Sequence, residues 1–292
     1  MAKRALQEIN AGSMADIAFL LLIFFLVTTT MDKDAGLMRV LPPPPDKTLP
    51  DQQMDRRQRD IFIVLINKDN KMLVEGKIMP VYQVGEGSSR KLVDAAKNEL
   101  GEMVYVYAGT NSIVSNNDLM RITPNEDLRD QVKEFILNPM DKSNLPEFRT
   151  VNTSLCNEKI TEATAAIQAN TPATTTELAD ALEKASKEKE KWEKKLNAIK
   201  TLETYGSGQR SYREAPMLVI SLQNDKGTSY AAYIAVQNEL TRAYREIREE
   251  YCKKVFGKPF AELDTETEED KIDAIETIIP IKISEAEPKE IK

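Results

Sequence analysis

One stretch of this sequence is so apolar that it constrains the whole chain, namely the segment ending in FLLLIFFLVTTT. No charged side chain occurs from Ile17 to Met31. At about 1.5 Å per helical residue this run reaches about 22 Å, which is shorter than the ~30 Å hydrocarbon core of a bilayer. Extension back to Ile9 gives about 34 Å and adds one charged side chain, Asp16. The sequence therefore predicts a membrane-spanning helix that carries one carboxylate.

Asp16 admits two interpretations. A charged side chain near the centre of a membrane helix costs about 2.5–3.5 kcal/mol on insertion scales, and such residues usually mark ion or proton pathways. Alternatively, Ser13 and Asp16 form the Ser-x-x-Asp pattern of a helix cap, in which the carboxylate lies near the positive helix N-terminus. The two roles are compatible. Thr28, Thr29 and Thr30 likewise either line the exit of a pore or hydrogen-bond to carbonyls of their own helix.

Two other interpretations of the apolar run are weaker. A cleaved signal peptide fits the basic Lys3 and Arg4. However, an acid interrupts the lead-in, and no small-residue cleavage pattern precedes Met31. A core helix of a soluble domain would carry a polar stripe, and residues 17–27 offer none. We therefore expect a retained membrane anchor.

The positive bias of Lys3 and Arg4 favours an N-terminus in the cytoplasm, with the rest of the chain beyond the anchor outside it. The expected organisation is a cytoplasmic tail at 1–12, a transmembrane helix at 13–31, a proline-rich linker at 32–60 and a folded α/β domain at 61–292.

Composition excludes several classes of function. The net charge is −7, and no block rich in Lys and Arg with interleaved aromatics occurs, so no nucleic-acid partner is expected. The absence of His removes imidazole-based metal sites, catalytic triads and proton relays. Cys156 and Cys252 lack metal-binding spacing. They could pair in an oxidising compartment, but two isolated buried thiols are the simpler expectation. We expect neither a metal nor a cofactor.

The linker contains the run Val40, Leu41, Pro42 and Pro43, with two more prolines directly after it. Proline-rich segments adopt the stiff, extended polyproline II conformation. Val40 and Leu41 alternate faces before proline interrupts the hydrogen-bond ladder, so this segment suits addition to the edge of a sheet. A plain spacer is the alternative interpretation.

The first part of the domain shows strand patterns. IFIVLIN at 61–67 and MLVEGKIM at 72–79, around a polar turn, predict a β-hairpin. A helix capped by Ser89 is expected to stop at Gly101, and residues 103–107 are typical of a strand. Thr123-Pro124 is then expected to open a helix that ends before Pro139.

The second part alternates between helix and strand. From Leu178 to Ile199 the apolar residues follow a heptad rhythm that is broken only where Lys189 falls on the seam. With a break at Thr171-Pro172 upstream, the region 157–205 predicts an αα-hairpin. MLVISLQ at 217–223 predicts a strand, and 229–256 a long amphipathic helix ended by Gly257. The acidic run at 264–273 suits a solvated helix face, and IIPIKI at 278–283 is expected to form a last strand at a sheet edge.

Several of these features together resemble the ExbD/TolR biopolymer-transport family. They are Ile9, the segment Met14-Ala15-Asp16-Ile17 that leads into LLLIFFLV, and Val40-Leu41-Pro42-Pro43 after the anchor. The strand and helix patterns at 61–79, 217–256 and 278–283 are also similar. The chain departs from the family between Gly85 and Ala215, which has no counterpart in the compact family domain; the helical insertion is placed roughly at 110–210.

The resemblance implies an α+β protein: one N-terminal transmembrane helix and a two-layer α/β periplasmic domain with a large helical insertion. It implies an inner-membrane motor subunit that dimerises, with Asp16 as the proton-translocating residue inside an ExbB/TolQ-like polytopic partner. Such a motor passes proton-motive force to a TonB- or TolA-like transducer. Val40, Leu41, Pro42 and Pro43 are the expected partner-docking residues.

Three alternatives remain open at this level. The chain could act in TonB-dependent outer-membrane transport or, like TolR, in envelope integrity. It could also be a membrane-anchored, envelope-binding protein in which Ser13 and Asp16 only cap the helix. An anchored enzyme is disfavoured because the chain lacks a nucleophile elbow, a zinc-protease motif and a glycine-rich phosphate loop.

Overall fold

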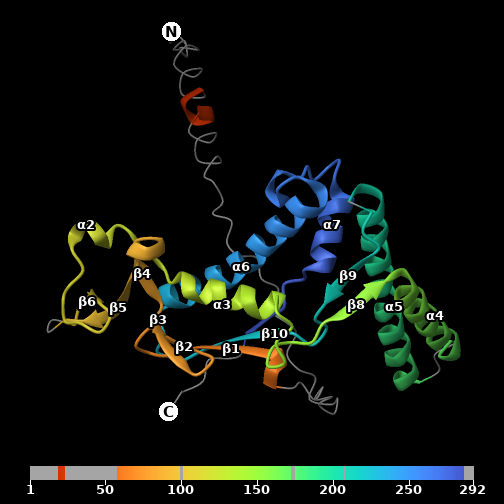
Figure 1. The fold of residues 1–292 in the computed structure, drawn as a ribbon, viewed down its shortest axis with the longest axis horizontal. Coiled ribbons are helices and arrows are strands. Elements are labelled where there is room, and N and C mark those ends of the chain that lie inside the picture. The colour runs from red at the N-terminus through yellow and green to blue at the C-terminus, as the bar shows by residue number, and fades with distance from the viewer. Residues whose placement is uncertain (1–18, 24–57, 99–100, 172–174, 207, 286–292) are drawn as a thin grey trace, which may run out of the picture. The chain divides into compact units, whose positions relative to one another are not determined.

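The computed structural model describes residues 19–23, 58–98, 101–171, 175–206 and 208–285. The chain divides into two compact units, residues 1–53 and residues 54–292. In the first unit, residues 19–23 are helical and their apolar side chains are exposed. The second unit contains all the strands that the described ranges include (Figure 1).

A five-stranded mixed sheet, in the order β11-β10-β1-β2-β3, organises the second unit. Its strands are β1 (Ile61–Ile66), β2 (Lys71–Val74), β3 (Lys77–Pro80), β10 (Val219–Asn224) and β11 (Ile283–Glu285). β1 runs antiparallel to β2 and parallel to β10. The expected hairpin is confirmed, except that a turn at Glu75 and Gly76, both at positive φ, divides its second arm into β2 and β3.

Alternation along β1 decides which face of this sheet is covered. Phe62, Val64 and Ile66 are buried, whereas Ile63 between them is exposed, as expected when successive side chains point to opposite faces. The helices α3 (Glu126–Leu137) and α6 (Tyr230–Phe256) pack against the buried residues and form one hydrophobic core with them (Figure 1). A helix layer on a sheet confirms the α+β fold class.

The two core helices begin and end as capping rules require, with one correction. Thr123-Pro124 does not open α3, because Pro124 pairs with Tyr82 in a sheet and Asn125 caps the helix instead. The side chain of Asn125 accepts a hydrogen bond from Asp127 N at 3.0 Å. At α6 the expected boundaries are confirmed: Ser229 caps its start, and Gly257 ends it at a φ of 74°, where glycine has no Cβ penalty.

A second, four-stranded sheet lies at one end of the unit (Figure 1). Its order is β6-β5-β4-β7, with β4 (Tyr82–Val84), β5 (Lys91–Lys97), β6 (Met103–Tyr107) and β7 (Ile122–Pro124). The short 3₁₀ helix η2 (Gly87–Ser89) and helix α2 (Asn116–Leu119) connect these strands.

This small sheet overturns the helix expected between Ser89 and Gly101. The segment is strand β5, and its Val93 pairs with Tyr82 on one side and Tyr107 on the other. The spacing of its apolar residues fits a helix, but pairing on both sides satisfies the backbone of a strand and buries the β-branched Val93 completely. The strand expected at 103–107 is confirmed as β6.

At the other end of the unit lies a lobe that we call the helical lobe (Figure 1). It comprises β8 (Arg149–Asn152), α4 (Thr153–Ala169), α5 (Thr176–Tyr205), β9 (Ser211–Glu214) and α7 (Glu269–Ile278). α4 and α5 confirm the expected αα-hairpin. Its core includes Trp192, Ile199 and Leu202, and Cys156 and Cys252 are free and buried rather than paired.

The C-terminal segment corrects the expected last strand. Ile278 ends helix α7, and only Ile283–Glu285 forms a strand, β11, which lies parallel to β10 at the sheet edge. The difference arises because Ile275 and Ile278 are buried at helical spacing, Ile278 in the core of the lobe and Ile275 beside Cys252 and Leu263. The edge position itself was expected, since Pro280 cannot donate to a ladder. The 3₁₀ helices η1 (Gln58–Asp60) and η3 (Phe260–Glu262) complete the described elements.

Candidate functional site

The residues that the sequence singled out lie outside the described ranges. These are Ser13, Asp16, Thr28, Thr29 and Thr30 of the anchor, and Val40, Leu41, Pro42 and Pro43 of the linker. Among the residues that the structure does describe, no helix has the length and apolar character needed to cross a membrane. Likewise, no group of three or more Asp, Glu or Cys side chains there could hold a metal ion.

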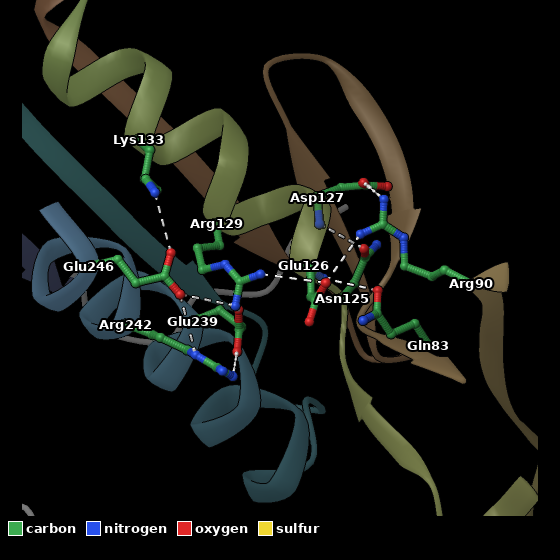
Figure 2. A network of polar contacts seen from close by, with 10 residues as sticks. All are labelled: Gln83, Arg90, Asn125, Glu126, Asp127, Arg129, Lys133, Glu239, Arg242 and Glu246. Carbon is green, nitrogen blue, oxygen red and sulfur yellow. Dashed lines mark hydrogen bonds and ion pairs between the residues drawn. The ribbon is translucent and has the colours of Figure 1, made fainter. Parts of the chain in front are cut away.

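The described residues nevertheless contain a site that the sequence did not single out, a charge network where α3, α6 and the small sheet meet (Figure 2). Its base is the start of α3. Asn125 is 1% exposed and donates from Nδ2 to Pro80 O at 3.0 Å. The Glu126 N–H donates to Oε1 of the fully buried Gln83 at 3.1 Å. These bonds fix the N-terminus of α3 against β3 and β4.

Arg90 fastens the same helix end to the small sheet. Its Nη2 lies 2.6 Å from Asp127 Oδ1, and its Nη1 lies 3.5 Å from Glu126 Oε2 (Figure 2). Asp127 and Glu126 occupy the first turn of α3, where the helix dipole also favours carboxylates. The small sheet is therefore linked electrostatically to the helix that covers the large sheet.

Arg129 extends the network from α3 to α6. Its side chain is 12% exposed and lies 3.4 Å from Glu126, 3.9 Å from Glu239 and 3.3 Å from Glu246. One turn further along α3, Lys133 lies 3.4 Å from the same Glu246 (Figure 2). A single carboxylate on α6 thus faces two cations on α3, and Lys133 also pairs with Glu250 of α6 at 2.7 Å, so a connected set of ion pairs joins the two helices.

Glu239 is the exception within this network. It is 3% exposed, and its Oε2 is buried without a hydrogen bond from any described residue. Burial raises the pKa of Glu239, and Arg129 and Arg242 only partly oppose that effect. Their guanidinium nitrogens lie at 3.9 and 3.7 Å, beyond hydrogen-bond distance. Burial without hydrogen bonds therefore favours the protonated form of Glu239 more than water does.

A second buried ion cluster lies in the helical lobe. Lys195 Nζ is 2.7 Å from both carboxylate oxygens of Glu214, and Arg149 Nη2 lies 3.1 Å from the same group. Trp192 receives both cations on its ring, at 4.4 Å for Lys195 and 5.0 Å for Arg149. Burial is the largest single influence and pushes the pKa of Glu214 upward, but the hydrogen bonds and charges of Lys195 and Arg149 together outweigh it and hold that pKa below its usual value.

Neither cluster was predicted, yet each left a signal in the sequence. Val236, Glu239, Leu240 and Ala243 follow the spacing of a buried helix stripe, so a charge occupies a core position. Lys195 lies between Trp192 and Ile199 on the buried face of α5 in the same way. The heptad analysis placed a lysine on the helix seam at Lys189, which is not among the buried residues of α5.

Comparison with known proteins gives one match. The family model described as biopolymer transport protein ExbD/TolR matches residues 2–248. The match includes Asp16, the linker, both sheets up to β10 and the α4–α5 hairpin; it ends within α6, so α7 and β11 lie beyond it. Neither curated proteins nor solved structures gave a match. Because the family model covers most of the 292 residues, the chain belongs to the ExbD/TolR family.

Proposed function

We propose that this chain is the proton-driven subunit of an inner-membrane motor, with Asp16 as the residue that takes up and releases the proton. One observation carries the proposal: within the family match, Asp16 is the single charged residue between Ile9 and Met31. Ionisable residues in membrane helices usually mark ion or proton pathways. Membership of a biopolymer-transport family supplies the task that proton flow would drive.

The energetics of this role are sufficient. A proton that crosses a potential of 100 mV releases about 2.3 kcal/mol. A single helix provides no water-filled path to Asp16 from either side, because lipid surrounds it. We therefore propose an ExbB/TolQ-like polytopic partner, within which the chain acts as a dimer. Ser13 would line the entrance and Thr28, Thr29 and Thr30 the exit of the path.

The proposed output is mechanical. A domain on the periplasmic side, joined through the linker, would pass the conformational change to a TonB- or TolA-like transducer. We propose that Val40, Leu41, Pro42 and Pro43 dock as an extended strand on a sheet edge. The large sheet offers two edges, β3 and β11, and Ile78 on β3 is 72% exposed. Addition to an edge uses backbone groups that are otherwise unpaired.

Energised transport through an outer-membrane receptor is the function we favour over TolR-like envelope maintenance. Asp16→Asn tests the central step, because asparagine caps a helix as well as aspartate does but does not titrate. We expect this variant to insert and to co-purify with its polytopic partner, yet to lose transport. Asp16→Glu should retain part of the activity.

The matched control is Asp32→Asn, which removes a carboxylate just beyond the apolar run. It should transport normally. Full transport by Asp16→Asn in a strain without a paralogue would refute the proton role and leave Ser13 and Asp16 as a helix cap. Loss of transport together with loss of partner binding would instead show a structural role, so both quantities are measured in the same membranes.

A further inference from the structure

A pocket of about 530 Å³ lies on the helical lobe, beside the residues that lead into strand β11. Its wall comes from β8, β9, α5, the end of α7 and the segment directly before β11, which meet at this end of the unit (Figure 1). The volume lies within the range of about 300–1,000 Å³ that is typical of small-molecule sites.

The wall of this pocket is strongly basic. Its basic residues are Arg149, Lys187, Lys191, Lys194, Lys195 and Lys282, and its acidic residues are Glu190 and Glu214. Six positive and two negative charges leave a formal charge of +4. The chain as a whole has a net charge of −7, so the pocket is a local exception to its acidic character.

The protein compensates this charge incompletely. Lys195 and Arg149 share one buried carboxylate, that of Glu214. Lys282 makes no ion pair with any residue that the structure describes. Its Nζ instead donates to two backbone carbonyls, at 2.8 and 3.2 Å, which leaves one of its three N–H groups without a described acceptor.

The cations also lie close enough together to repel one another. Burial lowers the pKa of Lys282, and Glu214 only partly opposes that effect. Three positive charges lower this pKa further, those of Lys195, Lys191 and Arg149. Charges at a protein surface interact more strongly than charges in bulk water. A bound anion would therefore gain attraction from several cations that now repel one another.

The side chains that can touch an anion are the exposed ones. Lys195 is 4% exposed and bound to Glu214, so it contributes charge but no contact. Arg149 is 38% exposed and binds Glu214 through Nε and Nη2, which leaves Nη1 available. Lys191 is 55% exposed, and its partner Glu188 lies outside the wall. Exposed pairs of this kind are weak, so an anion can replace them.

We propose that this pocket binds a diphosphate, that is, two linked phosphate groups. One group contacts Arg149 and Lys282, and the other contacts Lys187 and Lys191 at the exposed side of the pocket. A phosphate group carries a charge of about −1.5 to −2 at pH 7, so two groups match the charge of the wall, whereas one carboxylate does not. The guanidinium fork of Arg149 also suits phosphate oxygens. This site is separate from the proposed proton path at Asp16.

The probe is inorganic pyrophosphate, titrated by calorimetry into the full chain in nanodiscs of zwitterionic lipid. We expect one ion bound per chain, with an affinity that falls as the salt concentration rises. Lys191→Gln should weaken binding by about tenfold, the usual worth of one hydrogen bond from a charged group. Lys189→Gln is the matched control, because Lys189 lies on the same helix, pairs with Glu193 and is outside the wall. Absence of saturable binding, or equal affinity of the two variants, would overturn the proposal.

Lys282→Gln tests the other end of the site. The glutamine amide keeps a donor for the backbone carbonyls but removes the charge, so binding should weaken while the melting temperature without the anion stays level. A lysine with a purely structural role would show a lower melting temperature and unchanged affinity. If Lys282→Gln fails to fold, Lys191→Gln and Lys189→Gln still decide the proposal.

Two further titrations identify the anion. Inorganic phosphate should bind more weakly than pyrophosphate, and equal affinity would overturn the assignment of two phosphate groups. Nanodiscs that contain a long-chain prenyl diphosphate distinguish a lipid headgroup from a free ion, with discs of the same charge made from phosphatidylglycerol as the control. A loss of pyrophosphate affinity in the first discs alone would place the lipid headgroup in the pocket, and unchanged affinity in both would identify free diphosphate. Either result supports the site.

These measurements use binding alone, so their outcome is independent of whether Asp16 drives transport.

Discussion

Two glutamates in this protein are buried to a similar degree, but their pKa values are shifted in opposite directions. Glu214 in the helical lobe is 8% exposed, and Glu239 in the α3–α6 network is 3% exposed. Each faces two basic side chains. Yet the pKa of Glu214 lies below the ordinary value and that of Glu239 above it, although burial alone raises both.

The distance to the cation explains the difference. Lys195 binds both oxygens of Glu214 at 2.7 Å, which is a charge-assisted hydrogen bond. The arginines near Glu239 remain at 3.7 Å or more and donate no such bond. Direct hydrogen bonds, added to nearby charge, thus favour the charged form of a buried carboxylate more than nearby charge does alone. The cluster of the helical lobe favours the charged form of Glu214, whereas burial at the contact between α3 and α6 favours the protonated form of Glu239.

Removal of the cation from the lobe cluster should have the largest effect. Lys195→Met leaves Glu214 buried with only the partly exposed Arg149, and loss of one partner of a buried ion pair costs about 3 kcal/mol or more. Denaturant titration of the full chain, followed through the fluorescence of Trp192, measures the effect in the lobe itself. Lys194→Met is the control, because Lys194 is exposed and pairs with the exposed Glu190. An equal decrease in unfolding free energy for both variants would contradict a special role of the buried ion pair.

The same substitution at the two acids should give unequal results. Glu214→Gln removes charge-assisted bonds and leaves Lys195 buried beside a neutral amide, so we expect a loss of about 2 kcal/mol in unfolding free energy. Glu239→Gln removes a charge that burial already disfavours, so we expect a change below about 1 kcal/mol. The two variants are compared at pH 7 in one denaturant series. Equal losses of unfolding free energy would show that the charged form of Glu239 stabilises the fold as much as that of Glu214.

The sequence predicted most of the fold where local signals agree with tertiary packing. The long helix α6 has a serine cap, a continuous apolar stripe and a terminal glycine, and all three are found where expected. The hairpin of β1 and β2 is set by its alternation and its turn. Strand β5 was missed because its identity depends on two partners, Tyr82 and Tyr107, that its own residues do not reveal.

The charge clusters show a different limit. The sequence signals that Glu239 and Lys195 occupy core positions, because each interrupts an apolar helix stripe. It does not signal the partners, since Arg129 and Glu239 are brought together only when α3 crosses α6. Which of the many acids binds Lys195 likewise depends on β9, which places Glu214 beside it. The roles of Asp16, Ser13 and Thr28 remain predictions, because these residues lie outside the described ranges.

The pH dependence of stability should have opposite signs at the two sites. A folded-state pKa below the ordinary 4.5 means that Glu214 stabilises the protein above that pH and loses this contribution as the pH falls through its lower folded value. Glu239 has a raised folded pKa, so the folded state binds its proton more tightly. Its contribution therefore declines as the pH rises above 4.5 through the folded value.

Difference curves isolate these contributions from all other titrations. The stability of the wild type minus that of Glu214→Gln should increase with pH from below 4.5, whereas the wild type minus Glu239→Gln should decrease above it. Unfolding free energies measured from pH 2 to pH 8 give both curves. A rising curve for Glu239→Gln would mean that the α3–α6 contact holds a charged carboxylate and would remove the distinction between the sites.

The smallest effect is expected at Arg242, and it tests whether this arginine limits the rise that burial causes in the pKa of Glu239. Arg242 is 48% exposed and lies 3.7 Å from Glu239 and 3.6 Å from Glu246. Because an exposed ion pair contributes little, Arg242→Gln should change stability by about 0.5 kcal/mol or less. It should nevertheless raise the pKa of Glu239 further, since Arg242 partly opposes the effect of burial. The falling part of the difference curve should then move to higher pH.

The control is Arg245→Gln. Arg245 is also exposed on α6 but makes no ion pair among the described residues, so this variant should leave the difference curve in place. If the difference curves of the two variants fall at the same pH, Arg242 does not affect the pKa of Glu239, and Arg129 alone limits the rise in that pKa.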